Sequence, residues 1–197
     1  ECFGNAKTIR NHNSSRFGKF IKINYNNQKA IVSGWIDTYL LEQIRITSTN
    51  LNERCFHIFY QLFDNHQDFN YLQTDVQTDP YLDDQKMYHH MVEGFEFLQV
   101  NKTHTEQIFD LVKCVAYLGN IAWISTMVDS LKIEDEYQKK ICQIINIDIE
   151  TFSRCINKQK ISVSDEIYYR ELSPEQIKNK IDTLARFIYN NLFNHLV

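Results

Sequence analysis

The sequence predicts an α+β chain that is mainly helical, with one antiparallel β-hairpin near its N-terminus. Residues 20–25 and 30–40 are β-branched or aromatic at many positions and partly alternate with polar residues, which is typical of strands. Beyond residue 50 the apolar spacing changes to three and four residues, the period of a helix face. With five glycines and two prolines among 197 residues, a compact all-β fold with many tight turns is not expected. The length fits one domain or at most two small ones.

Charge, cysteine spacing and hydropathy exclude several classes of function. The formal net charge of -4 gives no overall positive field, so neither nucleic acid nor an anionic membrane surface is an expected partner. The five cysteines contain no C-x-x-C pair, which argues against a zinc ribbon and favours a reduced, intracellular protein. No apolar stretch reaches the ~18 residues that a membrane span needs.

The N-terminal third should contain a loop, a hairpin and then a helix. The first 18 residues are polar and rich in Asn, Ser and Arg, so we expect a loop there. Residues 26–28 suit the turn between the two strands. Residues 53–66 are expected to form a helix because aromatic residues recur along one of its faces. These aromatic residues, which we interpret as core packing, are Phe56, Phe59, Tyr60 and Phe63.

Three later helices are predicted from their ends and their periodicity. Thr103 and Glu106 form a capping-box pattern, and the helix that they begin should stop at Gly119. Residues 134–146 form a shorter amphipathic helix. Ser173 and the proline that follows it are a second cap, which opens the longest helix and leads to the end of the chain.

The segment with the clearest chemistry is N-H-N-S-S-R-F-G-K-F at residues 11–20. It places two hydroxyls in series beside an arginine and two amide side chains, in a loop that leads into a strand. A serine hydroxyl oxygen is a hard ligand suited to Mg²⁺, and serial loop amides can cradle phosphate oxygens. The alternative from composition alone is a polar loop that only makes a turn.

Several segments, in register, resemble the motor domain of the myosin heavy chain. Residues 3–8 read F-G-N-A-K-T and residues 10–20 read R-N-H-N-S-S-R-F-G-K-F, which is similar to the switch I region of that family. Further landmarks are T-Y-L-L-E at 38–42, E-R at 53–54, H-I-F-Y-Q-L at 57–62, L-G-N-I at 118–121 and D-T-L-A-R at 182–186. The resemblance therefore covers the chain from one end to the other.

The resemblance implies a part of an actin-based, ATP-driven motor that has a P-loop NTPase fold. Residues 1–48 would hold switch I and a hairpin of the motor's central sheet, and residues 49–197 a helical subdomain of the upper actin-binding region. The implied cofactors are ATP and Mg²⁺. The implied partners are actin filaments, the rest of the motor domain and, through regions outside this chain, light chains. The implied location is the cytoplasm, with the cytoskeleton.

The same resemblance assigns roles to residues of the switch. Asn11, Asn13, Ser14 and Ser15 would bind the nucleotide phosphates, and Ser15 would supply an oxygen ligand to Mg²⁺. Ser14 would lie beside the γ-phosphate and the lytic water, where its hydroxyl can relay a proton. Arg16 would pair with a glutamate of switch II when the loop closes. Phosphoryl transfer depends on such positioning and charge neutralisation more than on covalent help.

Two segments are expected to face actin by the same analogy. One is the link at residues 125–137, and the other is a strand–loop–strand at residues 156–170. In the second segment Lys158 and Lys160 could meet acidic actin. Glu166 stands where the family places an acidic or phosphorylatable residue, so we expect that actin activation needs no phosphorylation there.

Other motifs of the motor are missing from this sequence. No G-x-x-x-x-G-K-[ST] loop is present, and the G-F-E at residues 94–96 has Met91 where the D-x-x-G-F-E of switch II needs aspartate; it reads as helix. We therefore expect the chain by itself neither to bind ATP tightly nor to hydrolyse it. The alternative is a truncated, non-catalytic actin-binding or scaffold module derived from a motor, and a parent gene without an upstream Walker A loop would favour it.

Two further features concern histidines. His89 and His90 are adjacent and point to different helix faces, so a metal shared by them is not expected. His195 stands where a tryptophan is common in the family. This position lies outside the catalytic switch.

Overall fold

The computed structural model describes residues 1–63, 69–72, 81–125, 136–163 and 166–197. Within these ranges the chain combines helices with three small antiparallel sheets of two strands each. The elements in chain order are β1 (Asn5–Ala6), β2 (Ser14–Ser15), β3 (Gly18–Tyr25), β4 (Ile31–Tyr39), η1 (Gln43–Ile46), α1 (His57–Leu62), η3 (Asn70–Leu72), α2 (Asp84–Phe97), α3 (Lys102–Ser125), α4 (Glu136–Ile145), α5 (Ile149–Asn157), β5 (Lys158–Val163), β6 (Glu166–Glu171) and α6 (Pro174–Leu196).

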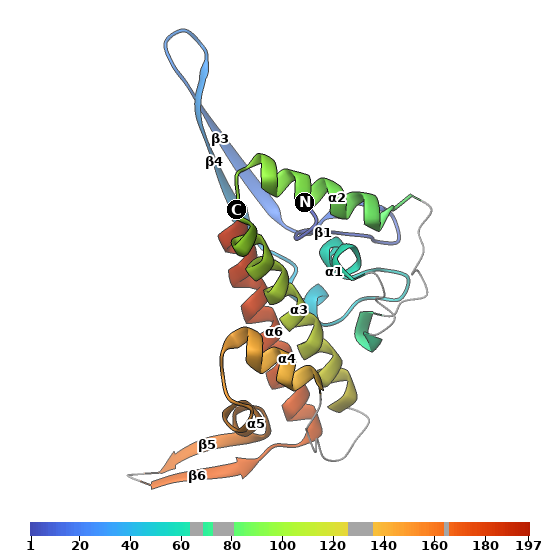
Figure 1. Cartoon of the computed structure of the whole chain (residues 1–197), viewed down its shortest axis with the longest axis vertical. Coiled ribbons are helices and arrows are strands. Elements are labelled where there is room, and N and C mark those ends of the chain that lie inside the picture. Colours follow the sequence, from blue (N-terminus) through green and yellow to red (C-terminus); the bar gives the residue numbers. More distant parts are fainter. Residues whose placement is uncertain (64–68, 73–80, 126–135, 164–165) are drawn as a thin grey trace.

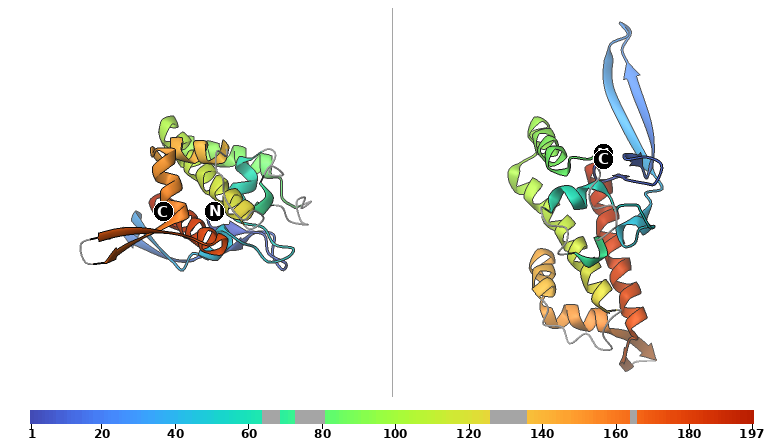
Figure 2. Two further views of the ribbon diagram at one scale, coloured as in Figure 1. Left: turned by 90° about the horizontal axis from the view of Figure 1, so that it is seen from below. Right: turned by 90° about the vertical axis from the view of Figure 1, so that its right-hand side faces the viewer.

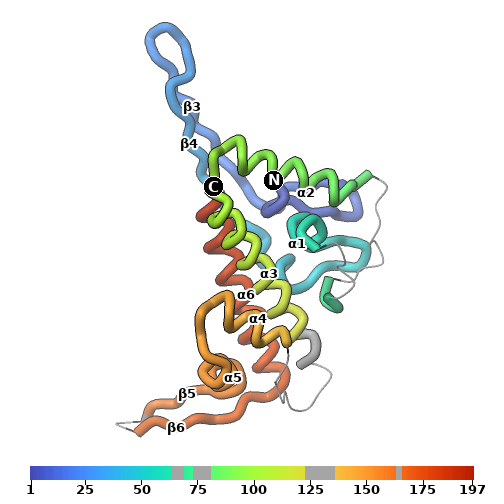
Figure 3. The backbone as a smooth tube through the Cα atoms, in the orientation of Figure 1, coloured from blue at the N-terminus to red at the C-terminus, as the bar shows by residue number. Residues whose placement is uncertain are grey.

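Two long antiparallel helices, α3 and α6, form the axis of the molecule (Figures 1 and 3). The β3–β4 hairpin extends from one end of this axis, and the β5–β6 hairpin lies at the other end (Figures 1 and 2). Helix α2 and the N-terminal segment lie at the same end as β3–β4. Helices α4 and α5 lie toward the β5–β6 end. None of the helices in the described ranges is long and apolar enough to cross a membrane.

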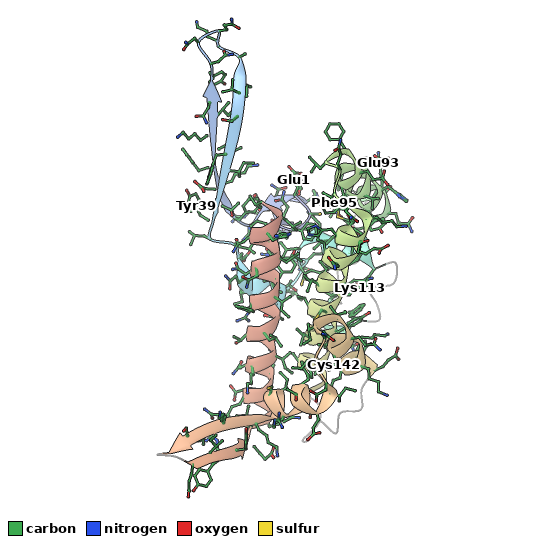
Figure 4. All side chains as sticks on the ribbon, turned by 60° about the vertical axis from the view of Figure 1, so that its left-hand side comes forward. Glu1, Tyr39, Glu93, Phe95, Lys113 and Cys142 are labelled. Atoms are coloured by element: carbon green, nitrogen blue, oxygen red, sulfur yellow. The ribbon has the colours of Figure 1, made fainter. Side chains whose placement is uncertain are left out.

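The β3–β4 hairpin is confirmed and stands clear of the helical body (Figures 2 and 4). Its register runs from Gly18 opposite Tyr39 to Tyr25 opposite Ile31. Asn26 closes the turn, because its Oδ1 accepts hydrogen bonds from the backbone N–H groups of Gln28 and Ala30, each at 2.9 Å. Large apolar side chains are nevertheless exposed on this hairpin, namely Phe20, Ile21, Ile23, Tyr25, Ile31, Val32, Trp35, Ile36 and Tyr39.

The hydrophobic core lies between α1, α3, α6 and the N-terminal segment. The ring of Tyr189 in α6 is fully buried and stacks on Phe56 and Phe59, with ring centroids 5.3 and 5.4 Å away. The Tyr189 hydroxyl donates to the backbone carbonyl of Phe3 at 2.9 Å. The aromatic residues of this region are thus core packing, as the sequence predicted, and Phe63 packs at the edge of the core.

The predicted helix over residues 53–66 was wrong in its extent. Helix α1 covers only His57–Leu62, and residues 64–66 lie outside the described residues. The residues before it pair with the N-terminal segment instead: Ala6 forms a β-bridge with Phe56, and the Arg54 N–H donates to the Lys7 carbonyl at 3.1 Å. The backbone is not helical on either side of α1, since Phe56 has a ψ of 146° and Phe63 is extended, so the helix is limited to His57–Leu62.

Both predicted ends of the helix over residues 103–119 were wrong. Helix α3 begins at Lys102, where Asn101 accepts the Thr103 N–H through its side-chain oxygen at 2.8 Å, so Asn101 provides the cap. At the other end the helix passes through Gly119 and reaches Ser125. The glycine serves packing, because a Cβ built on it would lie 2.5 Å from Cε1 of Tyr71.

The C-terminal elements largely follow the prediction. Helix α4 agrees with the described part of the segment predicted at 134–146, and the strand–loop–strand is present as β5 and β6. The capping box of α6 is complete: the Gln176 N–H donates to Ser173 Oγ at 3.3 Å, and the Ser173 N–H donates to the Gln176 side chain at 3.1 Å. Helix α5, which was not predicted from the sequence, is capped by Asp148, whose side chain accepts the Thr151 N–H at 2.7 Å.

The two helical glycines differ in their surroundings and offer a matched test of packing. We expect Gly119→Ala to lower the free energy of unfolding by about 1–3 kcal/mol, because Tyr71 must move to admit the methyl group. Gly94→Ala in α2 should instead be neutral or stabilise the protein by up to ~1 kcal/mol, because nothing lies within 4 Å of its added Cβ. Denaturant unfolding of both variants measures this difference, and an equal response would contradict the close contact at Gly119.

Candidate functional site

The candidate loop at residues 11–16 is attached to the core through a short antiparallel pair. Asn5 lies opposite Ser15 and Ala6 opposite Ser14, and Ala6 is fully buried. The backbone N–H of Arg16 donates to the Gly4 carbonyl at 2.8 Å, which continues the pairing by one residue. The two serines therefore lie on a strand whose partner belongs to the core.

A compact polar turn closes the loop on its other side. The Thr8 N–H donates to the Asn11 carbonyl at 2.8 Å, and the Asn11 N–H donates to Thr8 Oγ1 at 3.1 Å. Asn11 Oδ1 then accepts the Asn13 N–H at 2.8 Å. Because these short-range bonds fix the backbone, the exposed side chains of Asn11 and Asn13 start from defined positions.

The side chain of Asn13 is held by contacts with strand β1 and helix α1. Its side-chain oxygen accepts a hydrogen bond from Asn5 Nδ2 at 3.0 Å and lies 3.2 Å from His57 Nε2. An amide oxygen can only accept, so the neutral His57 ring donates through Nε2–H. Burial, together with the charge of Arg54, lowers the pKa of His57 to about 4, so the ring is neutral near pH 7.

His57 is a site residue that the sequence indicated only as part of a family landmark, H-I-F-Y-Q-L at residues 57–62. It begins helix α1 and is almost fully buried, and within the described residues its Nδ1 has no hydrogen-bond partner. It stands 44 positions from Asn13, so no local spacing pointed to the contact. A histidine within an otherwise apolar run was the available signal.

The two serines of the loop point in different directions. Neighbouring residues of a strand project to opposite faces, so Ser14 Oγ and Ser15 Oγ lie on opposite sides of β2. Ser14 shares its side with Arg16, whose Nη1 donates to Ser14 Oγ at 3.1 Å. The Ser15 side chain is exposed, and its Oγ makes only a 3.4 Å contact with the Phe17 carbonyl among the residues that the structure describes.

Arg16 is bound to a glutamate of this chain. Its Nε lies 2.5 Å from Glu42 Oε2, and the Glu42 N–H donates to the Arg16 carbonyl at 2.9 Å. Arg45 donates to the same carboxylate at 2.7 Å and also to Glu53 at 2.8 Å. Burial alone would raise the pKa of Glu42, but the hydrogen bonds from Arg16 and Arg45 outweigh burial and lower it. The carboxylate is therefore charged near pH 7.

The end of the loop is anchored by an aromatic contact. Phe17 packs edge-on against Phe193 of α6, with ring centroids 5.0 Å apart. Gly4 makes room for this ring, since a Cβ on Gly4 would lie 2.4 Å from Cε1 of Phe17. The loop is thus fixed to both the N-terminal segment and the C-terminal helix.

The residues predicted to face actin lie at the opposite end of the molecule, on β5–β6 (Figure 1). Lys158 forms an ion pair with Glu171 at 2.9 Å, and Lys160 is opposite Tyr169 in the register. The exposed Glu166 accepts a hydrogen bond from the Tyr168 hydroxyl. The other predicted actin-facing segment, at residues 125–137, falls mostly on residues 126–135, outside the described residues.

The oxygen chemistry of the loop suits a hard cation that brings its own ligands. In the described part of the chain, no group of three or more His, Cys, Asp or Glu side chains could hold a metal ion. Mg²⁺ does not require such a cage, because it is commonly bound by one or two protein oxygens together with substrate phosphates and water. The exposed Ser15 hydroxyl fits that role.

Comparisons with known proteins identify relatives along the whole chain. A family model described as myosin head (motor domain) matches residues 1–197. Myosin-2B of Naumovozyma castellii is 36% identical over 212 residues, which cover 100% of this chain and 15% of that protein. Myosin-2 of Arabidopsis thaliana is 32% identical over 213 residues, and human unconventional myosin-Va is 33% identical over 215 residues. Each of these two matches covers 100% of this chain. The matched region is 18% of the Arabidopsis protein and 12% of the human protein.

The buried neutral His57 predicts a pH dependence of stability. Its folded-state pKa of about 4 is below the ordinary value of 6.5, so the unfolded chain binds the proton more readily between these values. Stability is therefore present above pH 6.5 and is lost as the pH falls toward 4. We expect the free energy of unfolding to drop by about 2 kcal/mol between pH ~7.5 and pH ~5 from this group.

Denaturant unfolding of His57→Gln at both pH values tests this expectation. Glutamine keeps an N–H donor for Asn13 but does not titrate, so most of the pH dependence in this window should disappear. His90→Gln, which replaces an exposed histidine of α2, is the matched control and should keep it. The same loss of pH dependence in both variants would contradict the assignment to His57.

Proposed function

This chain belongs to the myosin head (motor domain) family, and we propose that it is the segment of an actin-based, ATP-driven motor that carries the phosphate-sensing switch and part of the actin-binding surface. The observation that carries the proposal is the loop at residues 11–16, where amide and hydroxyl groups project from a backbone fixed to the core. The chain spans only a small share of its relatives, so the whole activity needs elements beyond residues 1–197.

The exposed side of the loop is assigned to phosphate and Mg²⁺. Asn11 and Asn13 would donate side-chain N–H groups to phosphate oxygens, and the Ser15 hydroxyl oxygen would coordinate Mg²⁺. The held positions of Asn11 and Asn13 support this role, because pre-organised donors lose less entropy when they bind. Bound Mg²⁺ neutralises charge on the phosphates.

The opposite side of β2 is assigned to proton handling and to the switch. Ser14 Oγ accepts a hydrogen bond from Arg16, which leaves its own proton free to be donated toward a phosphate oxygen. Arg16 is held by Glu42, and we propose that this bond is exchanged for one to a glutamate of the second switch when the loop closes. The exchange conserves one charge-assisted bond, so it costs little free energy.

The β3–β4 hairpin is assigned to the central sheet of a P-loop NTPase motor. Its apolar side chains are exposed on both faces and its outer edges are unpaired among the described residues, whereas a strand pair with two apolar faces is typical of the buried interior of a larger sheet. The rest of the motor domain is the partner that would cover it. On this proposal residues 1–48 carry the switch and the sheet contribution, and residues 49–197 the actin-binding subdomain.

Replacement of Ser15 tests the proposed metal ligand. In the complete motor, Ser15→Cys should lower Mg²⁺-supported ATP turnover by roughly tenfold or more, because a thiol is a poor ligand for Mg²⁺. Mn²⁺ or Cd²⁺, which accept sulfur more readily, should restore part of that activity. Steady-state ATPase assays with each cation measure both effects.

A matched control separates ligation from folding. Ser153→Cys in α5 changes the same side chain far from the loop and should not alter the cation preference. If Ser15→Cys loses activity equally with all three cations, the side chain shapes the loop but does not bind the metal.

Replacement of Glu166 tests the proposed actin surface. In the complete motor, Glu166→Ala should weaken actin activation of the ATPase several-fold and leave the basal rate unchanged. Tyr168→Phe removes only the hydroxyl that donates to Glu166, so it is the control for a change of the hairpin itself. Unchanged activation in Glu166→Ala, measured over a range of actin concentrations, would remove this residue from the proposal.

A further inference from the structure

Two exposed histidines from different helices meet at the end of the molecule near β3–β4. His104 lies in the first turn of α3, and His195 lies in the last turn of α6. Their Nε2 atoms are 3.1 Å apart, and their ring centroids are 5.2 Å apart with an angle of 32° between the planes. The two residues are 91 positions apart in the chain, so only the antiparallel packing of α3 and α6 brings them together.

This separation suits two ligands of one metal ion. A Zn–N bond of about 2.0–2.1 Å with a ligand angle between 90° and 109° places two nitrogens about 2.8–3.4 Å apart. Imidazole is a preferred ligand of Zn²⁺, Ni²⁺ and Cu²⁺ in its neutral form. Both rings are open to solvent, so an ion can reach the Nε2 atoms and complete its coordination with water.

The local electrostatics do not oppose a cation at this point. The N-terminus of α3 carries a partial positive charge, and the C-terminus of α6 carries a partial negative charge, so the two helix ends largely offset one another. The nearest charged neighbours along α3 are Lys102 and Glu106, one of each sign. In α6, the last turn holds no other charged side chain.

We propose that His104 and His195 form a binding site for a divalent transition-metal ion of the Zn²⁺, Ni²⁺ and Cu²⁺ class. The ion bridges the first turn of α3 and the last turn of α6. Since the two ligands are already adjacent in the folded chain and far apart in the unfolded chain, binding stabilises the fold and joins the two helix ends. The site is independent of the nucleotide loop and of the proposed motor activity.

Cu²⁺ titration followed by electron paramagnetic resonance tests the site in the complete protein. The wild-type spectrum should contain a component with two coordinated imidazole nitrogens, and His104→Ala and His195→Ala should each lose it. Affinity for this ion should fall roughly tenfold or more in either variant, because the second ligand adds to binding intramolecularly. Metal should also raise the melting temperature of the wild type more than that of either variant.

Control variants distinguish chelation from a simple contact between the rings. His90→Ala removes an exposed histidine of α2 and should keep the two-nitrogen component. His195→Cys replaces the imidazole by a thiolate, which also binds Zn²⁺, so this variant should retain tight Zn²⁺ binding. The proposal is overturned if single-alanine variants bind Cu²⁺ as tightly as the wild type, or if the wild-type spectrum shows one nitrogen at this site; the pair is then only a hydrogen bond between helix ends.

Discussion

The buried hydroxyl of Tyr189 is the contact on which the arrangement of this chain depends. It donates to the carbonyl of Phe3, 186 positions away, while its ring stacks on Phe56 and on Phe59. A buried hydroxyl without a partner costs about 1–3 kcal/mol, so the N-terminal segment is held where its carbonyl meets α6. Strand β1 begins two residues later, and the candidate loop takes its position from that strand.

A set of charged groups connects this core to the loop. Glu42 binds Arg16 and Arg45, Arg45 also binds Glu53, and the Arg45 guanidinium donates to the Arg54 carbonyl at 3.0 Å. Arg54 is fully buried over the ring of Tyr60, 3.7 Å from its centroid, and pairs with Asp84 of α2 at 2.6 Å. Buried charges of this kind are tolerated when each finds opposite charge, and breaking one pair leaves the other charge exposed to a low dielectric. A displacement of Arg16 would therefore change the ion pairing of Glu42 and, through Arg45, of the elements that Arg45 joins.

The two hairpins illustrate different relations between sequence and surface. β5–β6 combines charged residues with the exposed side chains of Ile161, Ile167, Tyr168 and Tyr169, whereas β3–β4 exposes a longer run of apolar side chains along both faces. An isolated two-stranded hairpin is at best marginally stable in water, so β3–β4 requires a covering partner to be stable. On the proposed function, the remainder of the motor domain would supply this partner.

The sequence by itself determined features that depend on residues a few positions apart. The Asn26 turn, the Ser173 capping box and the aromatic face of Phe56 and Phe59 were predictable because each is a local pattern of hydrogen bonding or periodicity. Family landmarks located the candidate loop for the same reason, although its proposed phosphate and metal roles stay predictions. Tertiary structure alone decided the start of α1, where backbone groups pair with the N-terminal segment, and the passage of α3 through Gly119, where Tyr71 packs. It also decided that His57 supports Asn13 and that Glu42 binds Arg16, because contacts over 44 and 26 positions exist only once the core has brought distant segments together.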